Sequence, residues 1–138
     1  MNPDIDKPMV WIIDRQQWPR ALLRAELLER GYEAIGFEGV NDALRAFHFR
    51  LCGRLRVIIL ELKELAEGEE KVRTLVDLKI PTILLMGMAE ERTAVLQGMR
   101  QDVLLKRPFS IGRVVAEVDR QIEILRNQDG KAAIEPEG

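Results

Sequence analysis

Apolar residues recur along this chain in two alternating patterns. Five short runs are nearly continuous in β-branched and long aliphatic side chains, which is typical of strands buried on both faces of a parallel sheet. These runs are residues 9–13, 32–37, 56–60, 80–86 and 102–106. Between and after them, apolar residues lie three or four positions apart, as in amphipathic helices. The pattern therefore predicts five strands that alternate with helices.

Local signals place the ends of several predicted helices. In the first helix, Pro19 lies near the start and Gly31 is suited to end it. Its apolar stripe is predicted to consist of Ala21, Leu22, Ala25, Leu27 and Leu28. Asn41 and Ser110 are the predicted N-caps of the second and last helices. The third and fourth helices are predicted over residues 69–78 and 89–99.

This order predicts an α/β fold: a five-stranded parallel sheet with helices on both faces, in the (βα)5 flavodoxin-like arrangement. A chain of 138 residues suits one domain with one fold. We expect a lead-in over residues 1–8, the domain over 9–127, and a disordered tail over 128–138. The tail is polar and contains Gly130, Pro136 and Gly138.

Charge and composition exclude several classes of protein. The 21 basic and 23 acidic residues give a net charge of -2, so nothing draws the whole chain to nucleic acid or to a membrane. No apolar run approaches the roughly 20 residues of a membrane span. The single cysteine, Cys52, excludes an intrachain disulfide and a cysteine-based zinc cluster. We expect a cytoplasmic protein that binds neither DNA nor a membrane.

Candidate chemistry gathers where the predicted strands end. Asp14 and Arg15 follow the first strand, and Glu61 follows the third. Met86 ends the fourth, and Lys106 with Arg107 closes the fifth. Because the carboxyl ends of parallel strands share one sheet edge, we expect these residues to form a compact charged cluster.

In four stretches the chain resembles the receiver domain of two-component response regulators, over about residues 8–127. The stretches are residues 10–14, 57–62, 80–85 and 106–109, the last reading Lys-Arg-Pro-Phe. The resemblance implies an acidic pair after the first strand and an aspartate after the third, which together hold Mg²⁺. That aspartate accepts a phosphoryl group. A hydroxyl residue after the fourth strand and a lysine after the fifth contact the phosphate.

Carried onto this chain, the resemblance gives a degenerate site. Asp14 matches one acid of the pair, and Arg15 stands at the position of the other. Glu61 stands at the phosphoacceptor position, and Met86 at the hydroxyl position. The lysine position is matched by Lys106 or Arg107, because one extra residue precedes Pro108. In the family the peptide bond before this proline is often cis, so Pro108 is the candidate for a cis-proline in this chain.

Each departure opposes metal-dependent phosphorylation. Glu61 is one methylene longer than aspartate, which misplaces its carboxylate for in-line attack. Arg15 removes a metal ligand and repels Mg²⁺. Met86 has no hydroxyl to offer a phosphoryl oxygen. We therefore expect a pseudo-receiver with weak or no Mg²⁺ binding, no catalytic residue and no other cofactor. As a hypothesis, Arg15 replaces the metal by pairing with Glu61 or Asp14.

We expect the chain to bind a protein partner in a signalling pathway. The partner can be a second copy of the chain, in a homodimer formed through the fourth helix, fifth strand and fifth helix. Two alternatives stay open. One is a working phosphoacceptor that uses another carboxylate, such as Asp14 or Glu64. The other is a small enzyme or nucleotide-binding protein on the same fold, although no glycine-rich phosphate loop follows the first strand. His48 is expected to lie on a helix, away from the strand ends, and Trp18 to be partly exposed.

Overall fold

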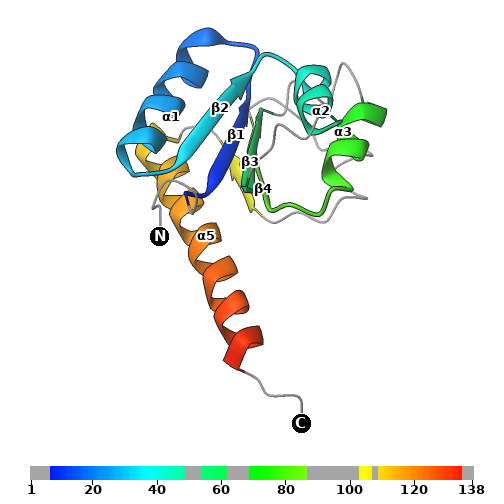
Figure 1. The fold of residues 1–138 in the computed structure, drawn as a ribbon. Coiled ribbons are helices and arrows are strands. Elements are labelled where there is room, and N and C mark those ends of the chain that lie inside the picture. Colours follow the sequence, from blue (N-terminus) through cyan, green and yellow to red (C-terminus); the bar gives the residue numbers. More distant parts are fainter. Residues whose placement is uncertain (1–6, 49–53, 62–68, 87–102, 107–108, 135–138) are drawn as a thin grey trace.

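Strands and helices alternate in the computed structural model, which describes residues 7–48, 54–61, 69–86, 103–106 and 109–134 (Figure 1). The elements are β1 (Met9–Ile13), α1 (Gln17–Glu29), β2 (Glu33–Phe37), α2 (Val40–His48), β3 (Leu55–Glu61), α3 (Glu69–Val76), β4 (Thr82–Met86), β5 (Val103–Lys106) and α5 (Ile111–Ile134). All five predicted strands are therefore present. The helix predicted over residues 89–99 lies outside the described residues.

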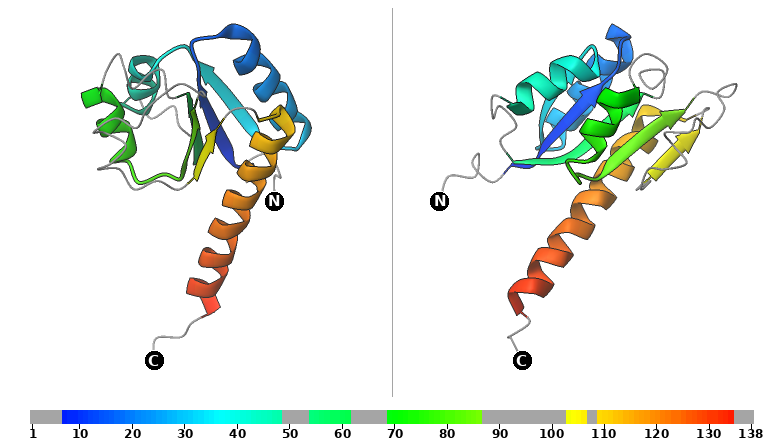
Figure 2. Two further views of the ribbon diagram at one scale, coloured as in Figure 1. Left: turned by 180° about the vertical axis from the view of Figure 1, so that it is seen from behind. Right: turned by 90° about the vertical axis from the view of Figure 1, so that its right-hand side faces the viewer.

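The five strands form one parallel sheet in the order β2-β1-β3-β4-β5. Helices α1 and α5 cover one face of this sheet, and α2 and α3 cover the other (Figures 1 and 2). The predicted doubly wound α/β fold is confirmed. The chain runs from β1 outward to β2 and then returns to the other side of β1 for β3. The switch point, where ligands bind in open α/β sheets, therefore lies between β1 and β3.

Two apolar cores form because successive side chains of a strand point to opposite faces. Trp11 and Ile13 of β1 belong to the α2/α3 core, and Val10 and Ile12 belong to the α1/α5 core. All four side chains are fully buried. Trp11 also contacts Phe37 edge to face, with ring centroids 4.9 Å apart. Such continuous burial explains why β1 has no polar face.

Helix α1 turns a different face to the sheet from the one predicted. Only Leu23 and Leu27, one turn apart, are buried in the α1/α5 core. Leu22 and Leu28 are 49% and 43% exposed. Of the predicted stripe, Leu27 is confirmed and the other four residues were wrong. Helix α1 has apolar residues on both sides, so spacing alone does not decide which side meets the sheet.

Most of the predicted helix ends hold. Gly31 follows α1 with φ of 91°, a left-handed conformation that glycine adopts without strain. Ser110 Oγ accepts a hydrogen bond of 3.0 Å from the Arg113 backbone N–H, which confirms the cap of α5. The cap at Asn41 was wrong. Helix α2 begins at Val40, one residue before Asn41. The Ala43 backbone N–H donates a hydrogen bond to the carbonyl of Gly39, the residue before the helix.

The predicted disordered tail over residues 128–138 was wrong for its first part, because α5 continues to Ile134. The last turns of α5 project well beyond the sheet (Figures 1 and 2). Gly130 costs a helix about 1 kcal/mol, but the following Lys-Ala-Ala run has high helix propensity. One glycine does not end a helix that is already nucleated. Residues 135–138 lie outside the described part of the chain.

One polar cluster attaches α5 to the start of β2. The Asp119 carboxylate on α5 accepts hydrogen bonds from Arg30 Nη1 and from the Tyr32 hydroxyl. Burial, together with the bond to Asp119, raises the pKa of Tyr32 to about 12. None of the described helices combines the length and the apolar character needed to span a bilayer.

Candidate functional site at the carboxyl edge of the sheet

Two acidic residues lie side by side at the switch point. Ile13 at the end of β1 pairs with Leu60 of β3, so Asp14 and Glu61 are the next residues on neighbouring parallel strands. Each is only 3% exposed. Burying a carboxylate is costly unless hydrogen bonds or opposite charges compensate it. This edge therefore holds acidic groups where an ordinary sheet end would be apolar or solvated.

The first turn after β1 fixes the position of Asp14. Its backbone N–H donates to the carbonyl of Phe37 at 3.0 Å, which continues the pairing of β1 with β2. Its Oδ1 accepts from the backbone N–H of Gln16 at 2.9 Å. Asp14 thus shapes the turn that leads into α1, and one of its carboxylate oxygens is committed to that turn.

Arg20 of α1 contacts this edge and was missed by the sequence reasoning. Its Nη1 donates to the carbonyl of Asp14 at 2.7 Å and lies 3.5 Å from the carbonyl of Arg15. Its Nη2 lies 3.9 Å from Oε1 of Glu38, beyond the end of β2. One side chain therefore joins the turn after β1 to the turn after β2.

Gly36 makes this position of Arg20 possible. A Cβ added at Gly36 would lie 2.7 Å from Cγ and 2.8 Å from Cδ of Arg20, closer than real side chains approach. An isolated glycine in a strand often marks such a close approach. Gly36 was therefore the one feature of the sequence that could have indicated this contact. It marks the place on β2 but does not identify Arg20 as the residue that approaches.

The structure describes three more of the predicted site residues, Arg15, Met86 and Lys106. Arg15 has an exposed side chain, and its pairing with Asp14 or Glu61 stays a prediction. Met86 is 4% exposed in the α2/α3 core, whereas Leu85, the neighbour of Glu61 in register, belongs to the α1/α5 core. Lys106 ends β5, paired with Met86. Arg107, Pro108 and Glu64 lie outside the described residues.

The described donor set does not fit the magnesium site that the resemblance implies. Mg²⁺ requires several hard oxygen ligands in near-octahedral geometry. Within the described ranges, no group of three or more His, Cys, Asp or Glu residues is placed to hold a metal ion. At the switch point itself, Asp14 and Glu61 supply two carboxylates, and the residue that follows Asp14 is a cation, Arg15, rather than a third acid.

Comparison with known proteins gives the fold. No family model matches the sequence, and no curated protein matches it. Among solved structures, it is similar to a response regulator receiver protein from Pseudomonas putida, with a TM-score of 0.70 and 23% identity over 83% of this chain and 97% of the other. The chain has the receiver fold.

Two further solved structures have the same fold as this chain. A CheY-like response regulator receiver domain protein from Methanospirillum hungatei JF-1 has a TM-score of 0.71 at 16% identity, covering 87% of this chain and 98% of its own. A response regulator receiver protein from Burkholderia phymatum has a TM-score of 0.68 at 21% identity, covering 85% and 96%. The receiver fold therefore spans nearly the whole of both compared chains, while the roles of individual site residues stay predictions.

Proposed function

We propose that this chain is a receiver-type signalling domain that works without phosphorylation, by binding a protein partner. One observation carries the proposal: the residue that ends β3 at the switch point of a receiver sheet is Glu61, and the residue after Asp14 is Arg15. In this proposal, Glu61 stands at the phosphoacceptor position and Arg15 at one metal-ligand position, so both positions differ from the receiver pattern.

The surroundings of Glu61 support the loss of phosphoryl transfer. The carboxylate is nearly inaccessible to solvent, and its extra methylene moves the oxygens away from the position an aspartate would give them. Phosphoryl transfer depends almost wholly on positioning and on neutralising the developing charge. A displaced carboxylate is poorly positioned for attack, and without a bound metal ion the developing charge is not neutralised.

The surroundings of Met86 support it as well. In the receiver family a hydroxyl at this position contacts the phosphoryl group, whereas Met86 packs in the α2/α3 core with Trp11 and Leu84. A thioether in an apolar core is a packing residue and offers no donor to an anion. Phosphate would therefore find no partner at this position.

Because added phosphate is not the signal in this proposal, the domain acts through the surface it presents. Helix α5 presents exposed Arg113 and Arg120, the latter paired with Glu117 at 2.7 Å. This mixed charge suits a specific protein contact, and a homodimer through this side of the molecule stays part of the proposal.

Acetyl phosphate tests the proposal directly. We expect the wild-type chain, incubated with acetyl phosphate and Mg²⁺, to keep its mass in intact mass spectrometry. A triple variant, Arg15→Asp with Glu61→Asp and Met86→Thr, restores the acids and the hydroxyl and is expected to gain one phosphoryl group. Uptake by the wild type that Glu61→Gln abolishes would overturn the proposal. Uptake that Glu61→Gln leaves intact would identify another carboxylate as the acceptor.

A further inference from the structure

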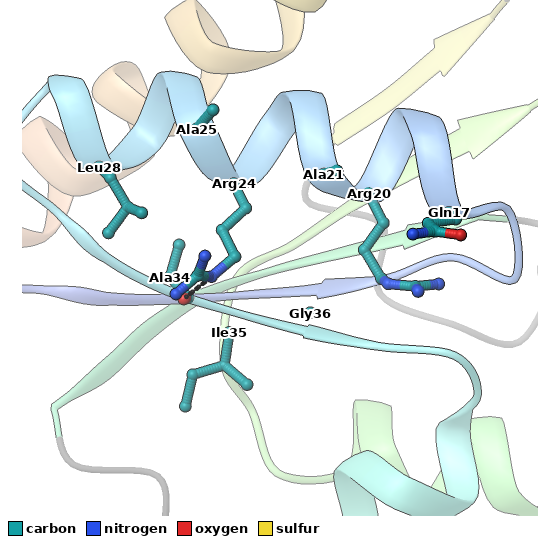
Figure 3. Close-up of a pocket in the computed structure, with 9 residues that line it drawn as sticks. All are labelled: Gln17, Arg20, Ala21, Arg24, Ala25, Leu28, Ala34, Ile35 and Gly36. Carbon is teal, nitrogen blue, oxygen red and sulfur yellow. Dashed lines mark hydrogen bonds between the residues drawn. The ribbon is translucent and has the colours of Figure 1, made fainter.

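An open groove of about 460 Å³ runs between α1 and the edge strand β2 (Figure 3). Its apolar walls come from Ala21, Ala25 and Leu28 of α1 and from Ala34 of β2. Ile35 also lines it, but the Ile35 side chain points to the α2/α3 face of the sheet. The charged side chains that line it are both arginines, Arg20 and Arg24, and none of the acidic residues that the structure describes lines it. The groove therefore combines apolar walls with positive charge.

Arg24 has hydrogen-bonding capacity left over. Its Nε donates to the carbonyl of Ala34 at 3.0 Å, which fixes the guanidinium over the strand (Figure 3). Within the described part of the chain, no carboxylate lies at ion-pair distance from Arg24, and the residue is exposed. Its two Nη groups form the fork that binds a carboxylate with two parallel hydrogen bonds.

The exposed apolar surface is concentrated beside this groove. The large apolar side chains that are exposed in the described ranges are Trp18, Leu22 and Leu28, and all three belong to α1. Leu28 lines the groove itself. Exposed apolar side chains gathered on one element, next to an unpaired charge, are typical of interaction surfaces.

The backbone of β2 is partly closed to another strand, although β2 is an edge of the sheet. Arg24 occupies the outward carbonyl of Ala34, and the stem of Arg20 lies over Gly36. The Arg24 bond removes one acceptor that an added strand would use. A ligand of the groove would therefore be recognised by side-chain contacts rather than by extending the sheet.

We propose that this groove binds an acidic peptide segment of a partner protein. A carboxylate of the segment binds the Nη groups of Arg24, and a neighbouring aliphatic side chain packs against Ala25 and Leu28. Charge complementarity selects this occupant, because both charged residues of the groove are cationic and Arg24 has no acidic partner among the described residues. The inference goes beyond the proposed function and does not depend on the chemistry of Glu61.

An NMR titration of the full ¹⁵N-labelled chain tests this site. The probe is an end-blocked hexapeptide of alternating leucine and glutamate, and the same peptide with lysine in place of glutamate is its control. We expect the acidic peptide to cause saturable shifts at the amides of Ala25, Leu28 and Ile35 and at the Arg24 Nε–H. The lysine peptide should cause none there.

Variants separate charge from fold. Arg24→Gln retains a donor for the Ala34 carbonyl but loses the charge, and it should weaken binding about tenfold or more, as expected for loss of a charge-assisted pair. Arg113→Glu changes an exposed arginine of α5 and should leave the affinity unchanged. An undisturbed spectrum of each free variant establishes that it is folded.

Three results would overturn the proposal. The first is the absence of saturable shifts, which would leave Arg24 with only its hydrogen bond to the Ala34 carbonyl as a role. The second is equal binding by the wild type and Arg24→Gln. The third is a set of shifts confined to Trp18 and Leu22, which would place the peptide on the exposed face of α1 and outside the groove.

Discussion

At the residue scale, Arg20 and Gly36 act as a pair. Arg20 reaches the carbonyl of Asp14 only because its stem crosses β2 at a position without a Cβ. The contact holds the turn that presents Asp14 at the switch point. The geometry of the acidic edge therefore depends on a glycine two strands away from Glu61.

Gly36→Ala should lower the free energy of unfolding by about 1–3 kcal/mol, the usual cost of forcing a side chain into a packed site. The new Cβ would lie within 2.8 Å of two Arg20 carbons, so the arginine must move. Urea denaturation measures the change. Gly112→Ala is the matched control, because its nearest neighbour lies 3.8 Å away and alanine suits a helix better. Equal effects of the two substitutions would contradict this account.

Asp14 and Glu61 could be predicted from the sequence because each comes where an apolar run stops, and parallel strands end at one edge. Arg20 could not be predicted. It lies on a helix with other arginines, Arg24 and Arg30, and only the packing of α1 on β2 selects it. Gly36 in β2 indicates a close approach by some other group, but the sequence does not show that this group is Arg20.

At the element scale, α5 is held by both its apolar face and one polar cluster. Val114, Val115 and Val118 are fully buried against the sheet. Asp119, which follows Val118, accepts hydrogen bonds from Arg30 and Tyr32 in the turn between α1 and β2. The helix is thus attached along its first half and projects beyond the sheet in its second (Figure 2).

Tyr32, the single tyrosine of the chain, reports on this cluster. Its pKa is raised from 10.0 to about 12, first by burial and then by Asp119, so the folded state favours the neutral phenol. Its contribution to stability is complete below pH 10 and is lost as the pH rises from about 10 to about 12. Ultraviolet titration of the tyrosinate should give a midpoint near 12. Asp119→Asn should lower that midpoint, and a wild-type midpoint at 10.0 would contradict the cluster.

Element boundaries were predictable where a residue has a unique conformational role, and uncertain elsewhere. The helix ends predicted at Gly31 and Ser110 are confirmed. The end of α5 was misjudged because Gly130 was weighted above the helix formers after it. The buried face of α1 was misjudged for a different reason: leucine and alanine occur on two of its faces, and solvent and sheet are distinguished only by tertiary packing.

At the scale of the whole molecule, the fold was predictable because every level of the pattern agreed. Continuous apolar strands, amphipathic helices and short connections all require a parallel sheet covered on both faces. The structure has that sheet and shares the receiver fold with solved response regulator structures. Function is not fixed by this agreement, because one fold hosts many sites. The proposed function rests on two residues at the switch point, Glu61 and Arg15, that differ from the residues the receiver resemblance implies.

The most direct test of a phosphorylation-independent receiver is a two-dimensional amide NMR titration of the full chain, first with Mg²⁺ and then with Mg²⁺ and beryllofluoride, a phosphoryl mimic. The account predicts no saturable shifts at the amides of Asp14, Glu61 and Lys106 in either step, because Arg15 and Glu61 leave no fitted metal or acceptor. Saturable shifts at these three amides would contradict it and would establish a working phosphoacceptor site.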